Sequence, residues 1–137
     1  MIIYTIGYGN RKPQEFFKLL TDNKINILID VRRKFTRAWA TAYTPQILNI
    51  ELTNMGIMYK SWNQLSNSCG TLRGYSEWLN TTSEGEIEMA RLSDYLDIMC
   101  IQNKIPVIMC AEFNPEFCHR KIITDFLAGH GYEVCHI

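Results

Sequence analysis

The stretch IPVIMCA, residues 105–111, is apolar almost throughout and lacks the polar and apolar alternation of a half-buried strand. A strand of this kind predicts a sheet that is covered on both faces. A helical pattern follows from about Pro115 to Ala128, and a further strand is expected at residues 133–137. The order strand, helix, strand is typical of parallel pairing, because parallel strands need a crossover between them.

The rest of the chain repeats this alternation. Pro13 and Pro45 suit the first position of a helix, and a third helical pattern runs through residues 86–103. Further apolar runs are expected to be strands, at residues 2–6, 25–31 and 57–62. We therefore predict a single α/β domain over residues 1–137, with a mostly parallel sheet of about five strands and helices on both faces.

Residues 63–85 interrupt the alternation. They are rich in Ser, Asn, Thr and Gly and show little periodicity, so we expect a long loop there. A loop of this length in a compact domain is usually functional or mobile.

The composition limits the functional classes to consider. The chain has 137 residues and a formal net charge of zero, so global charge gives no reason to expect nucleic acid or an anionic membrane as partner. No apolar run approaches the ~20 residues that span a bilayer. Residues 1–13 do not resemble a signal peptide. The five cysteines, an odd number, favour reduced thiols and a cytoplasmic location over a disulfide framework.

The segment after the 105–111 strand, CAEFNPEFCHR at residues 110–120, concentrates reactive side chains around a turn. Asn114 suits a helix N-cap and Pro115 the first helical position, so we expect a helix to begin just after Asn114. One turn before the apolar stripe of that helix lie Cys118 and His119, which should therefore face the sheet. Cys110 ends its strand on the same rim.

This placement favours chemistry. A thiol near a helix N-terminus with a basic neighbour can have a lowered pKa and act as a nucleophile. His119 and Glu112 could move protons, while Arg120 could reach back to bind an anion at the helix end. The alternative for each is structural: Cys110, Cys118 and His119 as buried core residues, and Arg120 paired with Glu112.

A metal site is a weaker interpretation. Possible ligands are Cys110, Cys118, His119, Cys135 and His136, but their spacing matches no zinc-binding pattern, and adjacent residues rarely ligate one ion. We predict no metal site, and the sequence identifies no cofactor.

The segment after the second strand carries the one basic and aromatic patch of the chain. Asp30 ends the strand, where catalytic or ligand-binding carboxylates are found, although it could equally pair with Arg32. Arg32 and Arg33 open the segment 32–43, in which basic and aromatic residues alternate. That mixture suits a nucleotide or single-stranded nucleic acid, and it would also suit a solvated loop.

The glycines of GYGNRKP, residues 7–13, do not complete a dinucleotide-binding GxGxxG pattern, because Lys12 stands at the third glycine. The turn could still bring Arg11 to an anion. If the sheet is parallel, Arg11, Arg32, Arg33 and Arg120 gather on one rim, which favours a small anionic ligand such as a phosphate or carboxylate.

The sequence resembles a bacterial and archaeal family known as domain of unknown function 488, which includes the YeaO-like proteins. The resemblance is carried by TIGYGNR (5–11), IDVRR (29–33), GIMY (56–59), MCAEFNPEFCHR (109–120) and GYEVCHI (131–137). The family pattern implies a site that includes Gly7, Asp30, Arg32, Tyr59, Cys110, Glu112, Cys118, His119, Arg120 and His136. It implies no particular activity.

Three functions follow from the sequence. The first is an enzyme acting on a small anionic or nucleotide-like substrate, with Cys118 or Cys110 as nucleophile or redox thiol and the arginines and Tyr59 binding the substrate. The second is a nucleic-acid-binding module that uses residues 32–43 and 63–85. The third is a ligand-sensing domain in which these residues only hold a hydrogen-bond network.

Overall fold

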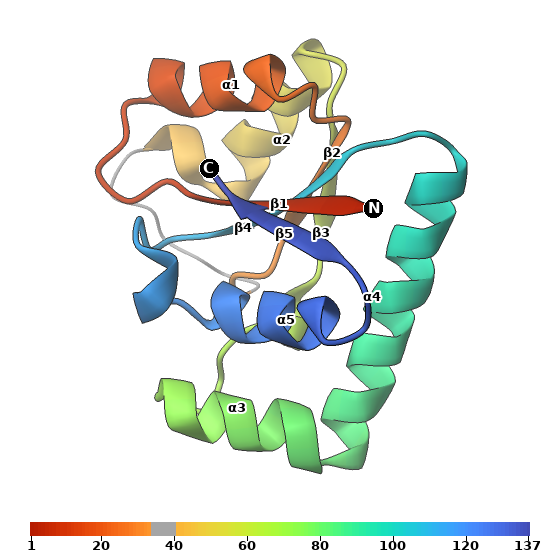
Figure 1. Cartoon of the computed structure of the whole chain (residues 1–137). Helices are drawn as coiled ribbons and strands as arrows, with labels where there is room; N and C mark the ends of the chain where they lie inside the picture. The colour runs from red at the N-terminus through yellow and green to blue at the C-terminus, as the bar shows by residue number, and fades with distance from the viewer. Residues whose placement is uncertain (34–40) are drawn as a thin grey trace.

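A computed structural model describes residues 1–33 and 41–137 of the chain (Figure 1). Its strands are β1 (Ile2–Gly7), β2 (Ile27–Asp30), β3 (Met58–Ser61), β4 (Pro106–Cys110) and β5 (Glu133–His136). Its α-helices are α1 (Pro13–Asp22), α2 (Pro45–Asn54), α3 (Leu72–Thr81), α4 (Ser83–Ile101) and α5 (His119–Ala128). Short 3-10 turns are η1 (Thr41–Tyr43), η2 (Asn63–Leu65) and η3 (Pro115–Phe117).

In the described part of the chain these strands form one five-stranded sheet in the order β3-β2-β4-β1-β5, and its pairs are parallel. The continuous apolar run at 105–111 supplies β4, the central strand, which is buried at every position. The edge strands β3 and β5 are mostly exposed. The predicted α/β fold with a parallel sheet is confirmed. β4 is apolar at successive positions because both faces of this central strand are covered by helices.

The helices cover both faces of the sheet, as Figure 1 shows with the sheet seen edge-on. Alternate residues of β4 point to opposite cores: Val107 and Met109 pack with α1 and α2, while Ile108 and Cys110 pack with α3, α4 and α5. The chain therefore buries two separate apolar layers against one sheet.

The interpretation of residues 63–85 as a long loop is wrong. The segment contains η2, helix α3 and the first turn of α4. The threonines that suggested a loop are N-caps: the Oγ1 of Thr71 accepts from the backbone N–H of Gly74 at 3.0 Å, and that of Thr82 from Gly85 at 3.1 Å. Only Tyr75 and Leu79 of α3 are buried, so its apolar stripe is too narrow to stand out in the sequence.

The helix expected from about Pro115 begins four residues later. Asn114 accepts from the backbone N–H of Glu116 at 3.0 Å, but it caps the 3-10 turn η3 instead of α5. Cys118 is extended, with φ −128° and ψ 141°, and is itself the N-cap residue of α5. This start places the Cys118 thiol at the helix end, where unpaired backbone N–H groups gather.

Gly7, the last residue of β1, is required by close packing. A Cβ atom built there would lie 1.7 Å from the backbone oxygen of Glu112 and 2.9 Å from a guanidinium nitrogen of Arg120. The connection between β4 and α5 therefore crosses directly over the end of β1, and only glycine leaves room for it.

We expect Gly7→Ala to lower the free energy of unfolding by about 3 kcal/mol, because a backbone oxygen must move to admit the methyl group. Urea denaturation of both proteins measures the loss. Gly129→Ala is the matched control, since its Cβ would meet only ordinary contacts at 3.4 and 3.7 Å. Equal effects at the two positions would contradict this account of the packing.

Candidate functional site

The carboxyl end of β4 is a topological switch point. β1 and β2, the neighbours of β4, lead to α1 and α2 on one face of the sheet, whereas β4 leads to α5 on the other face. Where successive connections pass to opposite faces of an open α/β sheet, a crevice forms at the carboxyl ends of the strands, and ligands usually bind in that crevice. Cys110 is the last residue of β4, and Cys118 opens α5, so both thiols belong to this position.

Three buried side chains meet there. Cys110, Cys118 and His119 are 6%, 3% and 7% exposed, and their Sγ, Sγ and ring nitrogen atoms all lie within 4.8 Å of one another. The Sγ atom of Cys110 is 3.6 Å from Nδ1 of His119. The sequence prediction that these residues share one rim and face the sheet is confirmed.

The protonation of His119 follows from its partners. Its Nε2 atom lies 3.0 Å from the carbonyl oxygen of Val31, which can only accept, so Nε2 carries a hydrogen. Nδ1 therefore accepts from a thiol when the ring is neutral and donates to a thiolate when the ring is charged. The Tyr75 ring packs edge-on against the imidazole, with centroids 5.0 Å apart, and fixes its orientation.

The two thiols differ in their tendency to ionise. The hydrogen bond from Cys110 does most to hold the pKa of the Cys118 thiol well below its usual value, against burial, and His119 and the backbone N–H of Arg120 lower it further. The same hydrogen bond, together with burial, raises the pKa of Cys110. Cys118 is thus the more acidic thiol of the pair.

Arg120 is the largest fully buried side chain among the described residues, 1% exposed. It reaches back over the helix start, as the sequence suggested. Its Nη1 donates to the backbone oxygen of Glu112, Nη2 to that of Phe113 at 3.1 Å, and Nε to the Thr5 hydroxyl at 3.4 Å. Its direct partner is therefore the Glu112 backbone, and the Glu112 side chain is exposed.

A second buried cluster forms around Asp30. Both carboxylate oxygens accept from Arg32, at 2.9 and 2.8 Å, and Oδ2 also accepts from the Tyr59 hydroxyl at 2.6 Å. Nη1 of Arg32 donates to the backbone oxygen of Tyr43 at 2.7 Å. The pairing with Asp30 raises the pKa of Arg32 although burial opposes it, and burial raises the pKa of Tyr59.

The structure thus divides the predicted site residues between two neighbouring clusters. Val31, whose carbonyl oxygen accepts from His119, lies between Asp30 and Arg32 in the chain and joins the two. The Asp30 carboxylate, Arg32 and Tyr59 contact one another, and Cys110, Cys118 and His119 contact one another.

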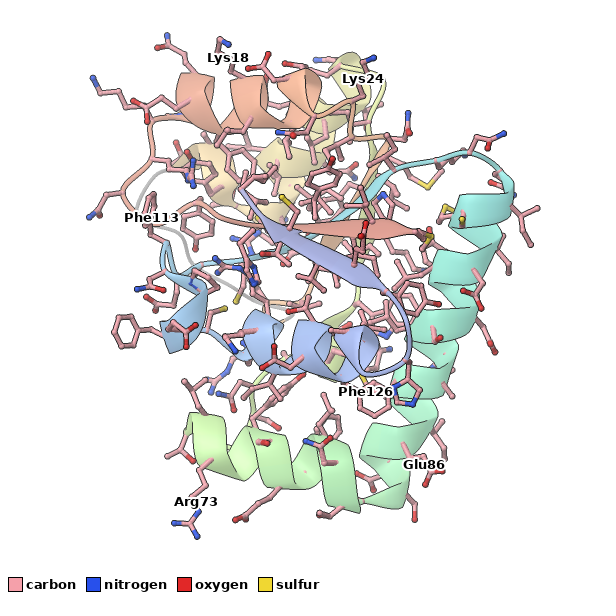
Figure 2. The ribbon with its side chains drawn as sticks, in the orientation of Figure 1. Lys18, Lys24, Arg73, Glu86, Phe113 and Phe126 are labelled. Atoms are coloured by element: carbon pink, nitrogen blue, oxygen red, sulfur yellow. The ribbon has the colours of Figure 1, made fainter. Side chains whose placement is uncertain are left out.

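The two other predicted arginines lie at the edge of the molecule. Arg11 donates to the backbone oxygens of Gly7 and Ile137, each at 3.0 Å, and its guanidinium lies 4.6 Å from the centre of the Phe113 ring. Figure 2 labels Phe113 beside the β4–α5 connection. Arg33 is exposed and donates to the backbone oxygen of Asn67 at 3.1 Å. Most of the basic and aromatic segment 32–43 falls on residues 34–40, outside the described residues.

Sequence reasoning missed two contributors. Tyr75 was assigned to the supposed loop, although the spacing of Tyr75 and Leu79 behind Thr71, a capping residue, is a helical signal. Thr5 lies on β1 with a fully buried side chain that accepts from Arg120 and hydrogen-bonds Nδ1 of His136. No local pattern predicts that role for Thr5, because its partners are distant in the sequence.

Among the described residues, Cys110, Cys118 and His119 form a group that could hold a metal ion. The 3.6 Å between Cys110 Sγ and His119 Nδ1 is close to the roughly 3.6 Å expected for two ligands of one tetrahedral zinc ion. The carbonyl of Val31 would orient the imidazole, as such partners commonly do. The three atoms would leave a fourth coordination position open.

The chain matches the family described as Domain of unknown function DUF488 over residues 12–127, and it therefore belongs to that family. The match includes both buried clusters, from Asp30 to Arg120. No curated protein and no solved structure matches the chain. No helix in the described ranges is both long and apolar enough to cross a membrane.

We expect Asp30→Asn to lower the free energy of unfolding by about 3–5 kcal/mol, because it leaves the buried Arg32 charge without its partner. Arg32→Leu should cost a similar amount, and the double variant clearly less than the sum of the two. Chemical denaturation of the four proteins gives the coupling energy. Arg73→Ala is the control: Arg73 points into solvent from α3 (Figure 2), and its loss should change stability little. Additive effects of Asp30→Asn and Arg32→Leu would contradict the pairing.

Proposed function

We propose that this protein is an enzyme that uses the Cys118 thiolate as its nucleophile on a small anionic substrate. The carrying observation is the placement of Cys118 at the N-terminus of α5, within 4.8 Å of the Cys110 sulfur and a His119 ring nitrogen, at the switch point of the sheet. A thiolate is a far better nucleophile than a thiol, and its formation is what such surroundings favour.

In the proposed reaction, the sulfur of Cys118 forms a covalent bond with the electrophilic atom of the substrate. His119 moves a proton through Nδ1, since Nε2 is committed to Val31. Glu112, whose exposed side chain lies on the β4–α5 connection, is the second proton carrier. Asp30, Arg32 and Tyr59 fix the neighbouring strand end, and with it the carbonyl that holds the imidazole.

The charge around the site supports an anionic substrate. The pKa of Arg11 is lowered by burial and then by the nearby positive charge of Arg120. Burial lowers the pKa of His136, and Arg120 and Lys121 lower it further. The positive charges of Arg11 and Arg120 repel each other, and a bound anion would relieve that repulsion.

Further features support a nucleotide-like substrate and a cytoplasmic location. The Phe113 ring is 57% exposed above the Arg11 guanidinium, so a planar group such as a nucleobase could stack on it. Arg33 would add positive charge at the same end of the sheet. A reactive thiolate also needs reducing surroundings, which is why we place the protein in the cytoplasm.

Alkylation of Cys118 by iodoacetamide tests the proposed nucleophile. Its rate in the folded protein should stay nearly constant between pH 6 and pH 8, because the thiol is already ionised below that range. N-acetylcysteine in the same solution should react about tenfold faster for each pH unit, as an ordinary thiol below its pKa. Peptide mass spectrometry gives the rate at Cys118 alone, and slow access to the buried sulfur changes its magnitude but not its pH profile. If Cys118 follows the N-acetylcysteine profile, it is an ordinary buried thiol.

Inorganic phosphate tests the anion site. Saturable protection of Cys118 from iodoacetamide is expected at low ionic strength, with chloride at matched ionic strength as the salt control. Arg11→Gln should weaken the protection about tenfold or more, Arg11→Lys less, and the remote Arg73→Gln not at all. Equal protection of all four proteins would mean that Arg11 does not bind the anion.

A further inference from the structure

We propose that Cys110 and Cys118 form a dithiol redox centre, in which Cys110 resolves oxidised Cys118 into an intramolecular disulfide. The inference rests on the proposed reactivity of Cys118 and adds a second role, for Cys110, that nucleophilic catalysis does not require. It makes Cys118 a modification site for hydroperoxides and makes the oxidation reversible by thiols.

The geometry supports a second thiol acting on the first. The two Sγ atoms lie within 4.8 Å of each other, so side-chain rotation could bring them to the ~2.05 Å of a disulfide. The three other cysteines, Cys69, Cys100 and Cys135, are exposed, whereas this pair is buried. Because both thiols of the pair are buried, a disulfide between two protein molecules is disfavoured there.

The surroundings also match the chemistry of the first step. Hydroperoxides react with thiolates, and Cys118 is the sulfur of the pair that stands at the N-terminus of α5. His119 lies beside both sulfurs and can supply a proton to the hydroxide that leaves when the disulfide forms.

The oxidation takes place in two steps. The Cys118 thiolate attacks one oxygen of hydrogen peroxide, the O–O bond breaks, and hydroxide leaves, so sulfur becomes a sulfenic acid while the peroxide is reduced by two electrons. The hydroxide takes the proton of Cys110 and becomes water. The Cys110 thiolate then attacks the Cys118 sulfur, the S–S bond forms and the S–O bond breaks. The second hydroxide takes a proton from His119 or solvent, giving a disulfide and two molecules of water.

The consequence for the proposed enzyme is reversible inactivation. A sulfur atom in a disulfide has no negative charge and cannot attack the substrate as a thiolate does. The interactions that stabilise the thiolate at the start of α5 are lost as well. Reduction by a dithiol would restore both.

The test uses the full chain with Cys69, Cys100 and Cys135 replaced by serine, reduced and treated with a chelator beforehand. Trypsin releases residues 105–120 as one peptide that contains both thiols, because cleavage sites follow Lys104 and Arg120 and none lies between. After hydrogen peroxide treatment of the folded protein, this peptide should lose two hydrogens, and dithiothreitol should restore its mass. At neutral pH, hydrogen peroxide should oxidise the denatured protein at least about ten times more slowly than the folded protein.

Two variants identify the role of each sulfur. Cys110→Ser should stop at a sulfenic acid on Cys118, which dimedone traps, whereas Cys118→Ser should leave Cys110 unmodified at the same dose. If the 105–120 peptide keeps its hydrogens in the folded protein while Cys118 still alkylates with a flat pH profile, the redox inference is wrong and the proposed nucleophile stands. If Cys118 neither oxidises nor alkylates as an ionised thiol, both are wrong.

Discussion

The geometry of the site depends on the hydrogen bonds that the buried guanidinium of Arg120 donates to the β4–α5 connection. The guanidinium donates to two successive backbone oxygens, those of Glu112 and Phe113, and to the hydroxyl of Thr5 on β1. A buried cation is costly unless its hydrogen bonds are made, so it fixes the path of the chain that accepts them. Gly7 leaves the space for that path. The result is a helix whose N-cap residue, Cys118, lies beside the end of β4.

The buried ion pair of Asp30 and Arg32 has a comparable role at the end of β2. Its bidentate hydrogen bonds and the contact from Tyr59 hold the chain where Val31 presents its carbonyl oxygen to His119. That hydrogen bond sets the ring nitrogen that faces the thiols. One charged cluster therefore positions the imidazole of the other, although the two share no side chain.

The fold could be predicted from the sequence because its central strand, residues 105–111, is apolar on both faces. The meeting of Cys110, Cys118 and His119 was also predictable, from the end of a strand and the start of a helix. Helix α3 was not, because only Tyr75 and Leu79 are buried in it. The N-cap position of Cys118 in α5 was not predictable either. Asn114 and Pro115 suit the start of a 3-10 turn as well as the start of a helix, and here they begin the 3-10 turn η3. The partners of Arg120 depend on tertiary contacts that no local pattern contains.

The proposed chemistry requires that Cys118 is ionised in the folded, reduced protein while Cys110 keeps its proton. Nuclear magnetic resonance of protein labelled with 13C at the cysteine Cβ atoms, assigned through the single serine variants, follows each thiol across a pH titration. We expect the Cβ of Cys118 to have the thiolate shift already at pH 6, and we expect Cys110 to show no titration up to pH 9. A Cys118 signal that moves with a midpoint near the ~8.5 of a free thiol, or a Cys110 that ionises first, would contradict the proposed chemistry.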